Sequence, residues 1–510
     1  MTWLLLALHI LLISAFGLRI LLRDDLRPDV RMGWLLVMVL LPYASCLLYY
    51  LFGEAALGRG RSRKRLNTHA YLLAHAPASQ LQQLQLGNTP QAAAASMGAA
   101  RQAIAPRWQS AFAYAASVNG FVPQGGHQAE LLADGAQARA RMLQDMDAAQ
   151  QEILVLYYIW LPDETGTAMA QALMRAAQRG VRCRAMVDGL GSRSLLRSPL
   201  WQQMGAAGVE LAVALPVHRP LHVMLTSRID LRNHRKITII DRHTTYCGSQ
   251  NCADEAFHIK PRYAPWVDIM LRMQGPLVLQ LQWVFASDWG QSDAKPFVPQ
   301  AFVPQTFEPP TPAPQPQAPE DGAPGPAEGF VAVAIADGPT ERPRSTPQLV
   351  ATLLASAQRE VVISTPYFVP DATVLEALCT TAWRGVQVSL ILPARNDSWI
   401  VGAASRSSYR RLLQAGVQLY EYRPGLLHAK TLCVDGELSL LGSTNLDLRS
   451  FDLNFENNVL LQDRTLTQAI RARQQDYIRD SFAVTATQVR AWPWWRRIWH
   501  NLLAMLSPVL

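Results

Sequence analysis

The stretch 426–456, LLHAKTLCVDGELSLLGSTNLDLRSFDLNFE, is an apolar run that a histidine and a lysine interrupt. A second stretch, 232–251, RNHRKITIIDRHTTYCGSQN, repeats this interruption with the same spacing. In both, an aspartate follows the histidine by seven residues, and Gly-Ser-x-Asn begins after seven more. A chain that places this pattern twice is expected to build one site from two halves.

Each stretch predicts a β-hairpin. Asp435-Gly436 is a turn sequence between two apolar runs, and Asp241 holds the same position in the first copy. Residues i and i+2 of a strand share a face, so histidine and lysine should project together, and the return strand should bring serine and asparagine beside them. The predicted patch contains His234, Lys236, Ser249 and Asn251 in the first half, and His428, Lys430, Ser443 and Asn445 in the second.

The sequence around the hairpins is also duplicated. Residues 148–189 and 356–394 each contain an apolar β-rich run, a turn, an amphipathic helix, Arg-Gly and a second apolar run. This order predicts a β-α-β unit with parallel strands covered by a helix, so the fold class is α/β, with a mixed sheet flanked by helices in each half. The predicted segments are a Gln/Ala-rich spacer at 56–106, a first domain at 107–291, a proline-rich linker at 292–327 and a second domain at 328–485.

Two apolar segments precede these domains. Residues 2–22 and 32–52 are each long enough to cross a bilayer, which predicts two transmembrane helices within 1–55. Pro42 leaves a kinked or re-entrant second segment open. Arginine and lysine are denser after the second segment than before it, which favours the main body on the cytoplasmic side. The tail, 486–510, combines tryptophan, arginine and leucine and predicts an amphipathic helix on anionic lipid or, alternatively, a helix packed on the body.

The composition agrees with an anionic partner. A length of 510 residues suits two domains. The formal charge of +8 suits an anionic partner such as nucleic acid or acidic lipid, and the mean hydropathy is +0.03. The six cysteines form no CxxC pair and no cluster with histidine, so they are interpreted as core residues in a reducing compartment. Neither a metal nor a cofactor is predicted.

The paired motifs suit a phosphodiester substrate. One neutral imidazole can attack phosphorus while a protonated imidazole opposite gives a proton to the leaving oxygen, and lysine and asparagine can hold the phosphate oxygens. A carboxylate on a neighbouring strand could fix each imidazole tautomer, and Asp268 and Glu456 are candidates because each follows its motif in an alternating apolar strand. For the remaining polar positions, the sequence favours turn or structural roles for Asp241 and Asp435, and either phosphate binding or turn formation for Ser249 and Ser443.

These residues resemble the duplicated HKD signature of the phospholipase D superfamily. Within it, WVDIMLRMQGP at 266–276, STPYFVPD at 364–371 and LYYLFGE at 48–54 are similar to bacterial cardiolipin synthases. The resemblance covers most of the chain outside the spacer and the linker. It implies transfer of a phosphatidyl group from phosphatidylglycerol through an enzyme adduct to a second phospholipid, with loss of glycerol. By the same resemblance, His234 is the nucleophile and His428 the general acid and then base (the reverse is also compatible), Lys236, Lys430, Asn251 and Asn445 bind phosphate, and Asp241 and Asp435 complete the catalytic signature.

The resemblance also implies partners and a location. The expected partners are anionic phospholipids (phosphatidylglycerol and cardiolipin) and the bilayer of a bacterial inner membrane, with the catalytic domains on its cytoplasmic side and with no nucleic acid. A phospholipase D-type hydrolase would pass the same adduct to water and make phosphatidic acid, and no residue decides between these acceptors. A phosphodiester nuclease is permitted by the positive charge, but the two apolar segments count against it. The oligomeric state stays open.

Overall fold

The computed structural model describes residues 2–24, 26, 28–53, 59–84, 97–217, 228, 230–301, 329–342 and 344–505. Most of the predicted proline-rich linker lies outside these residues. The chain divides into two compact units, one of residues 1–60 with 217–231 and one of residues 61–216 with 232–510.

The smaller unit contains three helices within its described part: α1 (Thr2–Leu21), α2 (Pro28–Leu40) and α3 (Pro42–Phe52). The second apolar segment is thus divided at Pro42, because proline lacks the backbone N–H that would continue α2 and fits at the first turn of α3. Among the described residues, no helix is long and apolar enough to cross a membrane. The prediction of two transmembrane helices is not confirmed.

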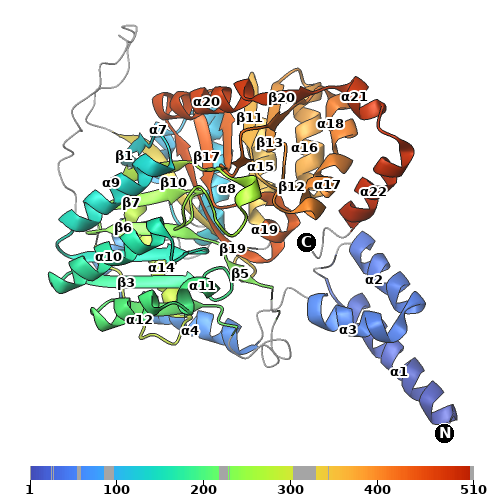
Figure 1. Cartoon of the computed structure of the whole chain (residues 1–510), viewed down its shortest axis with the longest axis horizontal. Helices are drawn as coiled ribbons and strands as arrows, with labels where there is room; N and C mark the ends of the chain where they lie inside the picture. Colours follow the sequence, from blue (N-terminus) through green and yellow to red (C-terminus); the bar gives the residue numbers. More distant parts are fainter. Residues whose placement is uncertain are drawn as a thin grey trace. The chain divides into compact units, whose positions relative to one another are not determined.

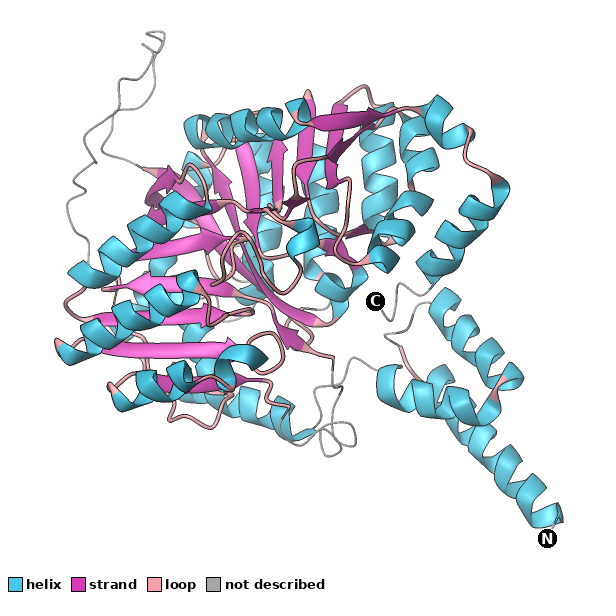
Figure 2. Cartoon of the chain, viewed as in Figure 1, coloured by secondary structure: helices cyan, strands magenta, loops and turns pink. Residues whose placement is uncertain are grey.

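The larger unit is built on a mixed β-sheet, whose strands are shown in Figures 1 and 2. Sixteen of the described strands belong to it, and its main path runs β20-β14-β13-β11-β16-β17-β19-β10-β1-β9-β7-β6-β2-β3-β4, with β5 paired to β19. The strands are β1 (Gln124–Leu131), β2 (Glu152–Tyr157), β3 (Arg182–Asp188), β4 (Glu210–Ala214), β5 (Arg232–Asn233), β6 (Lys236–Ile240), β7 (Thr244–Gly248), β8 (Trp266–Val267), β9 (Met270–Gln274), β10 (Phe330–Asp337), β11 (Glu360–Ser364), β12 (Phe368–Val369), β13 (Gln387–Pro393), β14 (Gln418–Tyr422), β15 (Leu426–Leu427), β16 (Thr431–Val434), β17 (Leu438–Gly442), β18 (Leu446–Asp447), β19 (Asn454–Gln462) and β20 (Ser481–Val484).

The path confirms the predicted duplication in a mixed α/β fold. From the middle outward, β1-β9-β7-β6-β2-β3-β4 has the same order and directions as β10-β19-β17-β16-β11-β13-β14. In each half, a helix connects two parallel strands: α10 (Glu164–Gln178) joins β2 to β3, and α16 (Ala372–Trp383) joins β11 to β13. Asp163 and Asp371 cap these helices by accepting backbone N–H bonds, so the two Pro-Asp sequences begin equivalent helices.

The two halves share one hydrophobic core. They join where β1 and β10 pair antiparallel, and α14 (Leu277–Trp289) is buried on nearly all sides, with strands of both halves beside it. Leu156 of β2 and Leu441 of β17 belong to the same buried cluster. The other described α-helices are α4 (Arg59–His75), α5 (Ala78–Leu84), α7 (Gly98–Ala103), α8 (Gln109–Asn119), α9 (Gly135–Ala148), α11 (Arg193–Leu196), α12 (Pro199–Ala206), α15 (Ser345–Ser356), α17 (Trp399–Ser407), α18 (Tyr409–Ala415), α19 (Leu448–Asp452), α20 (Arg464–Arg479), α21 (Ala486–Arg490) and α22 (Trp494–Met505).

The described part of the predicted spacer packs on this core. Leu72 of α4 and Leu84 of α5 are buried in it, and Thr68 Oγ1 donates a hydrogen bond to the carbonyl of Gly290 (3.1 Å). In the tail, α22 buries His500 and Leu503 next to α17, while its tryptophans stay exposed. The tail therefore forms a packed helix that also presents an apolar face.

Candidate active site

The two His-x-Lys motifs lie at breaks between strands, not inside one strand as the alternation argument expected. His234 falls between β5 and β6, and His428 falls between β15 and β16. In both motifs the lysine folds back, so that Lys236 Nζ donates to the His234 carbonyl and Lys430 Nζ to the His428 carbonyl, each at 2.6 Å. This local turn, rather than strand alternation, brings each lysine to its histidine.

Short parallel strands hold each histidine against the opposite half. β5 pairs with β19, and the His234 N–H donates to the carbonyl of Phe455 (2.8 Å). β15 pairs with β8, and the His428 N–H donates to the carbonyl of Val267, also at 2.8 Å. The two contacts are equivalent, because Phe455 and Val267 each precede a candidate carboxylate.

The carboxylates meet the histidines crosswise. His234 Nδ1 lies 2.8 Å from Glu456 Oε2, and His428 Nδ1 lies 2.6 Å from Asp268 Oδ1, so each imidazole is paired with a carboxylate of the other half. His234, His428 and Glu456 are buried, and the Asp268 side chain is 9% exposed. A carboxylate at Nδ1 fixes the tautomer with Nδ1–H donating, which leaves the Nε2 lone pair for chemistry.

The two serines support the carboxylates. Ser443 Oγ donates to Glu456 Oε2 and Ser249 Oγ donates to Asp268 Oδ1, both at 2.5 Å. A hydroxyl has one proton, so neither serine can donate to a phosphate while it holds its carboxylate. These bonds favour a positioning role for Ser249 and Ser443, and the predicted phosphate binding stays a prediction.

Asp241 and Asp435, which the signature groups with the catalytic residues, lie at the far ends of their hairpins. Asp241 accepts the backbone N–H groups of residues 150–152 at 2.7–3.0 Å, and Asp435 accepts those of residues 358–360, the shortest at 2.8 Å. A strand such as β6 places Asp241 roughly 16 Å from Lys236. Both carboxylates anchor the starts of β2 and β11, which fits the turn interpretation, and their catalytic grouping stays a prediction.

Burial and mutual charge shift the pKa values of the site. Burial lowers the pKa of His234 to about 4, and it lowers the pKa of Lys236 to about 8 and that of Lys430 to about 7. The charge of Lys430 contributes to the lowered pKa of His234, and the charge of Lys236 contributes to the lowered pKa of His428. Burial raises the pKa of Asp268, but the charge and hydrogen bond of His428 outweigh it and bring that pKa to about 2. Each histidine thus lies near enough to the lysine of the other half to be influenced by its charge.

Asn251 and Asn445 are also buried. Asn251 Oδ1 accepts from the N–H of Ile159 (3.3 Å), and Asn445 Nδ2 lies 3.3 Å from Ser450 Oγ. Among the described residues, the buried Asn445 Oδ1 has no hydrogen-bond partner. A buried amide oxygen without a partner is unusual unless a ligand or water completes it.

Two aromatic walls of the site were missed by the sequence reasoning. The Tyr158 ring stands edge-on to His234 with centroids 4.8 Å apart, and the Trp266 ring lies 4.6 Å from that of His428. Lys236 Nζ lies 5.6 Å from the centre of the Tyr158 ring. The available signal was position, because Tyr158 directly follows β2 and Trp266 stands two residues before Asp268.

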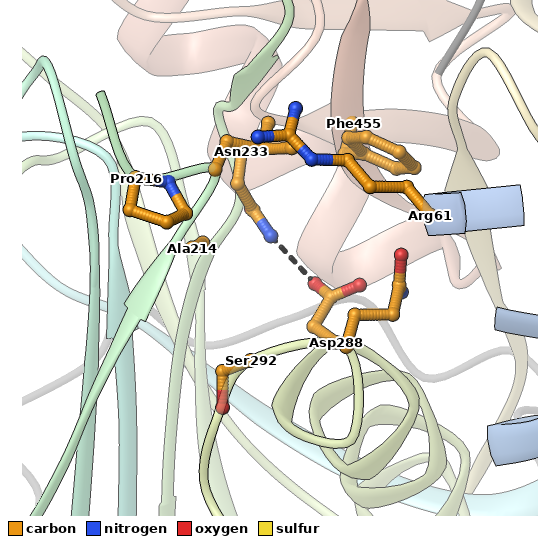
Figure 3. A pocket seen from close by; sticks show the side chains of 9 residues that line it. Arg61, Ala214, Pro216, Asn233, Asp288, Ser292 and Phe455 are labelled. Carbon is orange, nitrogen blue, oxygen red and sulfur yellow. Dashed lines mark hydrogen bonds between the residues drawn. The ribbon is translucent and has the colours of Figure 1, made fainter. Parts of the chain in front are cut away.

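A small cavity lies against the backbone that supports His234. Figure 3 shows Arg61, Asn233 and Asp288 converging on it, with Asn233 Nδ2 donating to Asp288 Oδ2 at 2.8 Å. Phe455 also lines it, and its free volume is about 40 Å³, enough for water only. Because Asn233 and Phe455 precede His234 and Glu456, this cavity borders the support of the site and not its reacting atoms.

Comparisons with known proteins place this geometry in a family. The model "Cardiolipin synthase, PLD-like domain" matches residues 142–289 and 350–477, one match for each half, and the model "Phospholipase_D-nuclease N-terminal" matches residues 3–54. Cardiolipin synthase A of Klebsiella pneumoniae (strain 342) is 35% identical over 515 residues, which cover 100% of this chain and 98% of that protein. The chain belongs to the bacterial cardiolipin synthases of the phospholipase D superfamily.

Further similarities agree with this family. Cardiolipin synthase A of Citrobacter koseri is 35% identical over 513 residues, with 100% of this chain and 98% of that protein covered. The crystal structure of phosphatidylserine synthase from Haemophilus influenzae Rd KW20 covers 75% of this chain and 93% of its own, with a TM-score of 0.53 and 16% identity, which is a likeness of fold. As a cardiolipin synthase relative, the chain is a phosphatidyltransferase that acts on phospholipids.

Proposed function

We propose that this enzyme makes cardiolipin by moving a phosphatidyl group from phosphatidylglycerol to the hydroxyl of a second phospholipid, through a phosphohistidine. The observation that carries the proposal is the crosswise pairing of two Ser–carboxylate–His sets, with two buried lysines beside them. Each set prepares one Nε2 atom, and two such atoms are what a two-step displacement at phosphorus needs.

In the first step, His234 Nε2 attacks the phosphorus of phosphatidylglycerol, and the bond from phosphorus to the headgroup glycerol oxygen breaks. His428 gives its Nε2 proton to that oxygen, so glycerol leaves neutral and His428 is left neutral. The phosphate charge next to His428 favours the protonated imidazole before this step, against the lowering that burial and Lys430 impose on its pKa.

In the second step, His428 acts as a general base and His234 is the leaving group. His428 Nε2 takes the proton from the hydroxyl of a second phospholipid, the oxygen attacks phosphorus, and the phosphorus–nitrogen bond to His234 breaks. Lys236, Lys430, Asn251 and Asn445 are proposed to bind the phosphate oxygens in both steps, because they are the cations and amides of the two repeated motifs.

We also propose that the enzyme is anchored in the bacterial inner membrane by residues 2–52, which cross it twice, with the larger unit on the cytoplasmic side. The segment matched by the N-terminal family model carries many exposed large apolar side chains, which water does not favour but lipid does. Those more than 55% exposed include Trp3, Leu11, Leu18, Leu21, Leu22, Met32, Leu36, Val39, Leu40, Leu41, Tyr43 and Leu47.

Product analysis tests the proposed reaction. Purified full-length protein in phosphatidylglycerol micelles is expected to release glycerol and form cardiolipin in equal amounts. Phosphatidic acid without cardiolipin would instead identify the hydrolase. His258 is exposed and has no role in the site, so His258→Ala is a matched control that should retain full turnover while His234→Ala and His428→Ala lose it.

A further inference from the structure

A second, larger cavity lies between α17, α18 and α22 and is lined by none of the residues of the candidate active site. Its volume is about 380 Å³, within the range of roughly 300–1,000 Å³ that small-molecule sites occupy. Basic side chains dominate its lining: Arg406, Arg410, Arg411, Arg497 and His500.

Two of these cations are already neutralised. Arg406 Nη2 lies 3.0 Å from Glu421 Oε1, and Arg411 forms an ion pair with Glu376. These pairs fix two guanidinium groups along the cavity without adding net charge to it. The net charge of the cavity therefore depends on the other basic residues that line it.

Arg410 and Arg497 supply that charge. Within the part of the chain that the structure describes, neither has a carboxylate within ion-pair distance. His500 is buried at the cavity wall, where burial and nearby arginines lower its pKa to about 4, so at neutral pH it is uncharged and can donate or accept a hydrogen bond. Two unpaired guanidinium groups around one cavity match the charge and geometry of a phosphate.

The helix that forms one wall also carries an exposed apolar face. On α22, Trp494 is 72% and Trp495 is 59% exposed, while His500 and Leu503 face inward. Trp499 stacks on Trp399 of α17, with centroids 6.0 Å apart, which extends the apolar surface to the next helix. Binding of a soluble phosphate would not involve this apolar surface, whereas a bilayer interface accommodates tryptophan beside arginine.

We propose that this cavity binds the phosphate headgroup of an anionic phospholipid, at a site separate from the catalytic histidines, in the bilayer on which α22 lies. Arg410 and Arg497 hold the phosphate, His500 donates a hydrogen bond to it, and the lipid chains lie along the exposed face of α22. The proposal uses the membrane location proposed above but does not depend on the proposed reaction.

Hydrogen exchange of the full-length protein in nanodiscs tests this site. Replacing part of the phosphatidylcholine with phosphatidylglycerol is expected to slow exchange in α18 and α22 by at least about threefold. The double variant Arg410→Gln/Arg497→Gln should lose this slowing. The matched control Arg464→Gln/Arg490→Gln removes the same charge from exposed positions on α20 and α21 that do not line the cavity, and should keep it.

Three results would overturn the proposed lipid site. Hydrogen exchange could fail to slow with phosphatidylglycerol, it could slow equally in the variant and the control, or inorganic phosphate in phosphatidylcholine discs could slow it equally. The last result would identify a soluble anion site. Cardiolipin formation by the same samples is measured separately. An inactive protein with intact slowing would refute the proposed reaction alone, and an active protein without slowing would refute the lipid site alone.

Discussion

In the first half of the larger unit, His234 contacts the Tyr158 ring and the Glu456 carboxylate, whereas His428 of the second half contacts the Trp266 ring and Asp268. The strand order, the lysine turn and the serine support are the same in both halves. Any difference in role between the two histidines therefore has to arise from these few neighbouring side chains and not from the frame.

The carboxylates differ in the number of groups that hold them. Asn454 stands two residues before Glu456 and donates to it at 3.1 Å, so Glu456 is bonded by Asn454, Ser443 and His234. At the equivalent position, Trp266 lies against the imidazole of His428 and leaves Asp268 with one fewer side-chain donor. The duplication thus preserved geometry while the electrostatics of the two histidines diverged.

The largest effect is expected when each histidine is removed in turn. His234→Ala should abolish transfer and labelling, because the proposed nucleophile is gone. His428→Ala should lower turnover by about 10²–10⁴-fold, the usual contribution of an acid–base group, yet still accumulate a phosphatidyl-enzyme. The measurement is the label that stays on protein quenched in denaturant at alkaline pH after incubation with labelled phosphatidylglycerol, because the phosphorus–nitrogen bond of a phosphohistidine hydrolyses in acid. Label on His234→Ala but not on His428→Ala would reverse the assignment.

Replacing the two carboxylates tests whether each one acts through the histidine of the other half. Glu456→Gln and Asp268→Asn are each expected to lower kcat by about 10–100-fold, as loss of a histidine-orienting partner usually does. With an activated leaving group such as p-nitrophenol, which needs no proton, Asp268→Asn should recover most of its loss and Glu456→Gln should not. Recovery in both variants, or in Glu456→Gln alone, would contradict the pairing of Asp268 with the general acid.

The lysines predict a pH dependence. Because burial lowers the pKa of Lys430 to about 7 and that of Lys236 to about 8, these cations are lost at lower pH than ordinary lysines. KM for phosphatidylglycerol should therefore rise as pH increases from 7 to 9, with less effect below pH 7. Lys430→Arg keeps its charge in this range, so its KM should rise less steeply, although its kcat falls. A pH profile identical to wild type would exclude Lys430 as the group responsible.

Sequence and structure agree best where the information is local. The β-α-β order, the aspartate turns and the identities of the buried imidazoles, lysines and carboxylates all follow from patterns within one half. The pairing of His234 with Glu456 depends on β5 and β19 meeting across the halves, and two-residue strands carry no periodicity from which such a contact could be predicted. The Tyr158 and Trp266 walls were missed for the same reason, because an aromatic residue beside an apolar strand usually indicates core.

The serines provide a smaller but more specific test. Ser249→Ala and Ser443→Ala each remove one hydrogen bond to a charged carboxylate, worth about 1.5–3 kcal/mol where it is buried. If the serines position the carboxylates, kcat should fall by about tenfold with KM nearly unchanged. If they bind phosphate instead, KM should rise. Ser443→Ala is expected to have the weaker effect, because Asn454 still holds Glu456 in place.

The smallest effect on catalysis is expected at the hairpin turns. Asp241→Asn and Asp435→Asn keep the size of the side chain and its tolerance of the left-handed backbone, with φ of 48° and 52°, but lose the charge that the backbone N–H groups meet. Asp435 also pairs with Arg107 at 3.2 Å, and no such partner is recorded for Asp241 among the described residues, so Asp435→Asn should lower the thermal midpoint more. The folded fraction of both variants should keep the kcat of the wild type, since these carboxylates touch only the starts of β2 and β11. A fall in kcat without a fall in the thermal midpoint would instead support the catalytic grouping of the two aspartates.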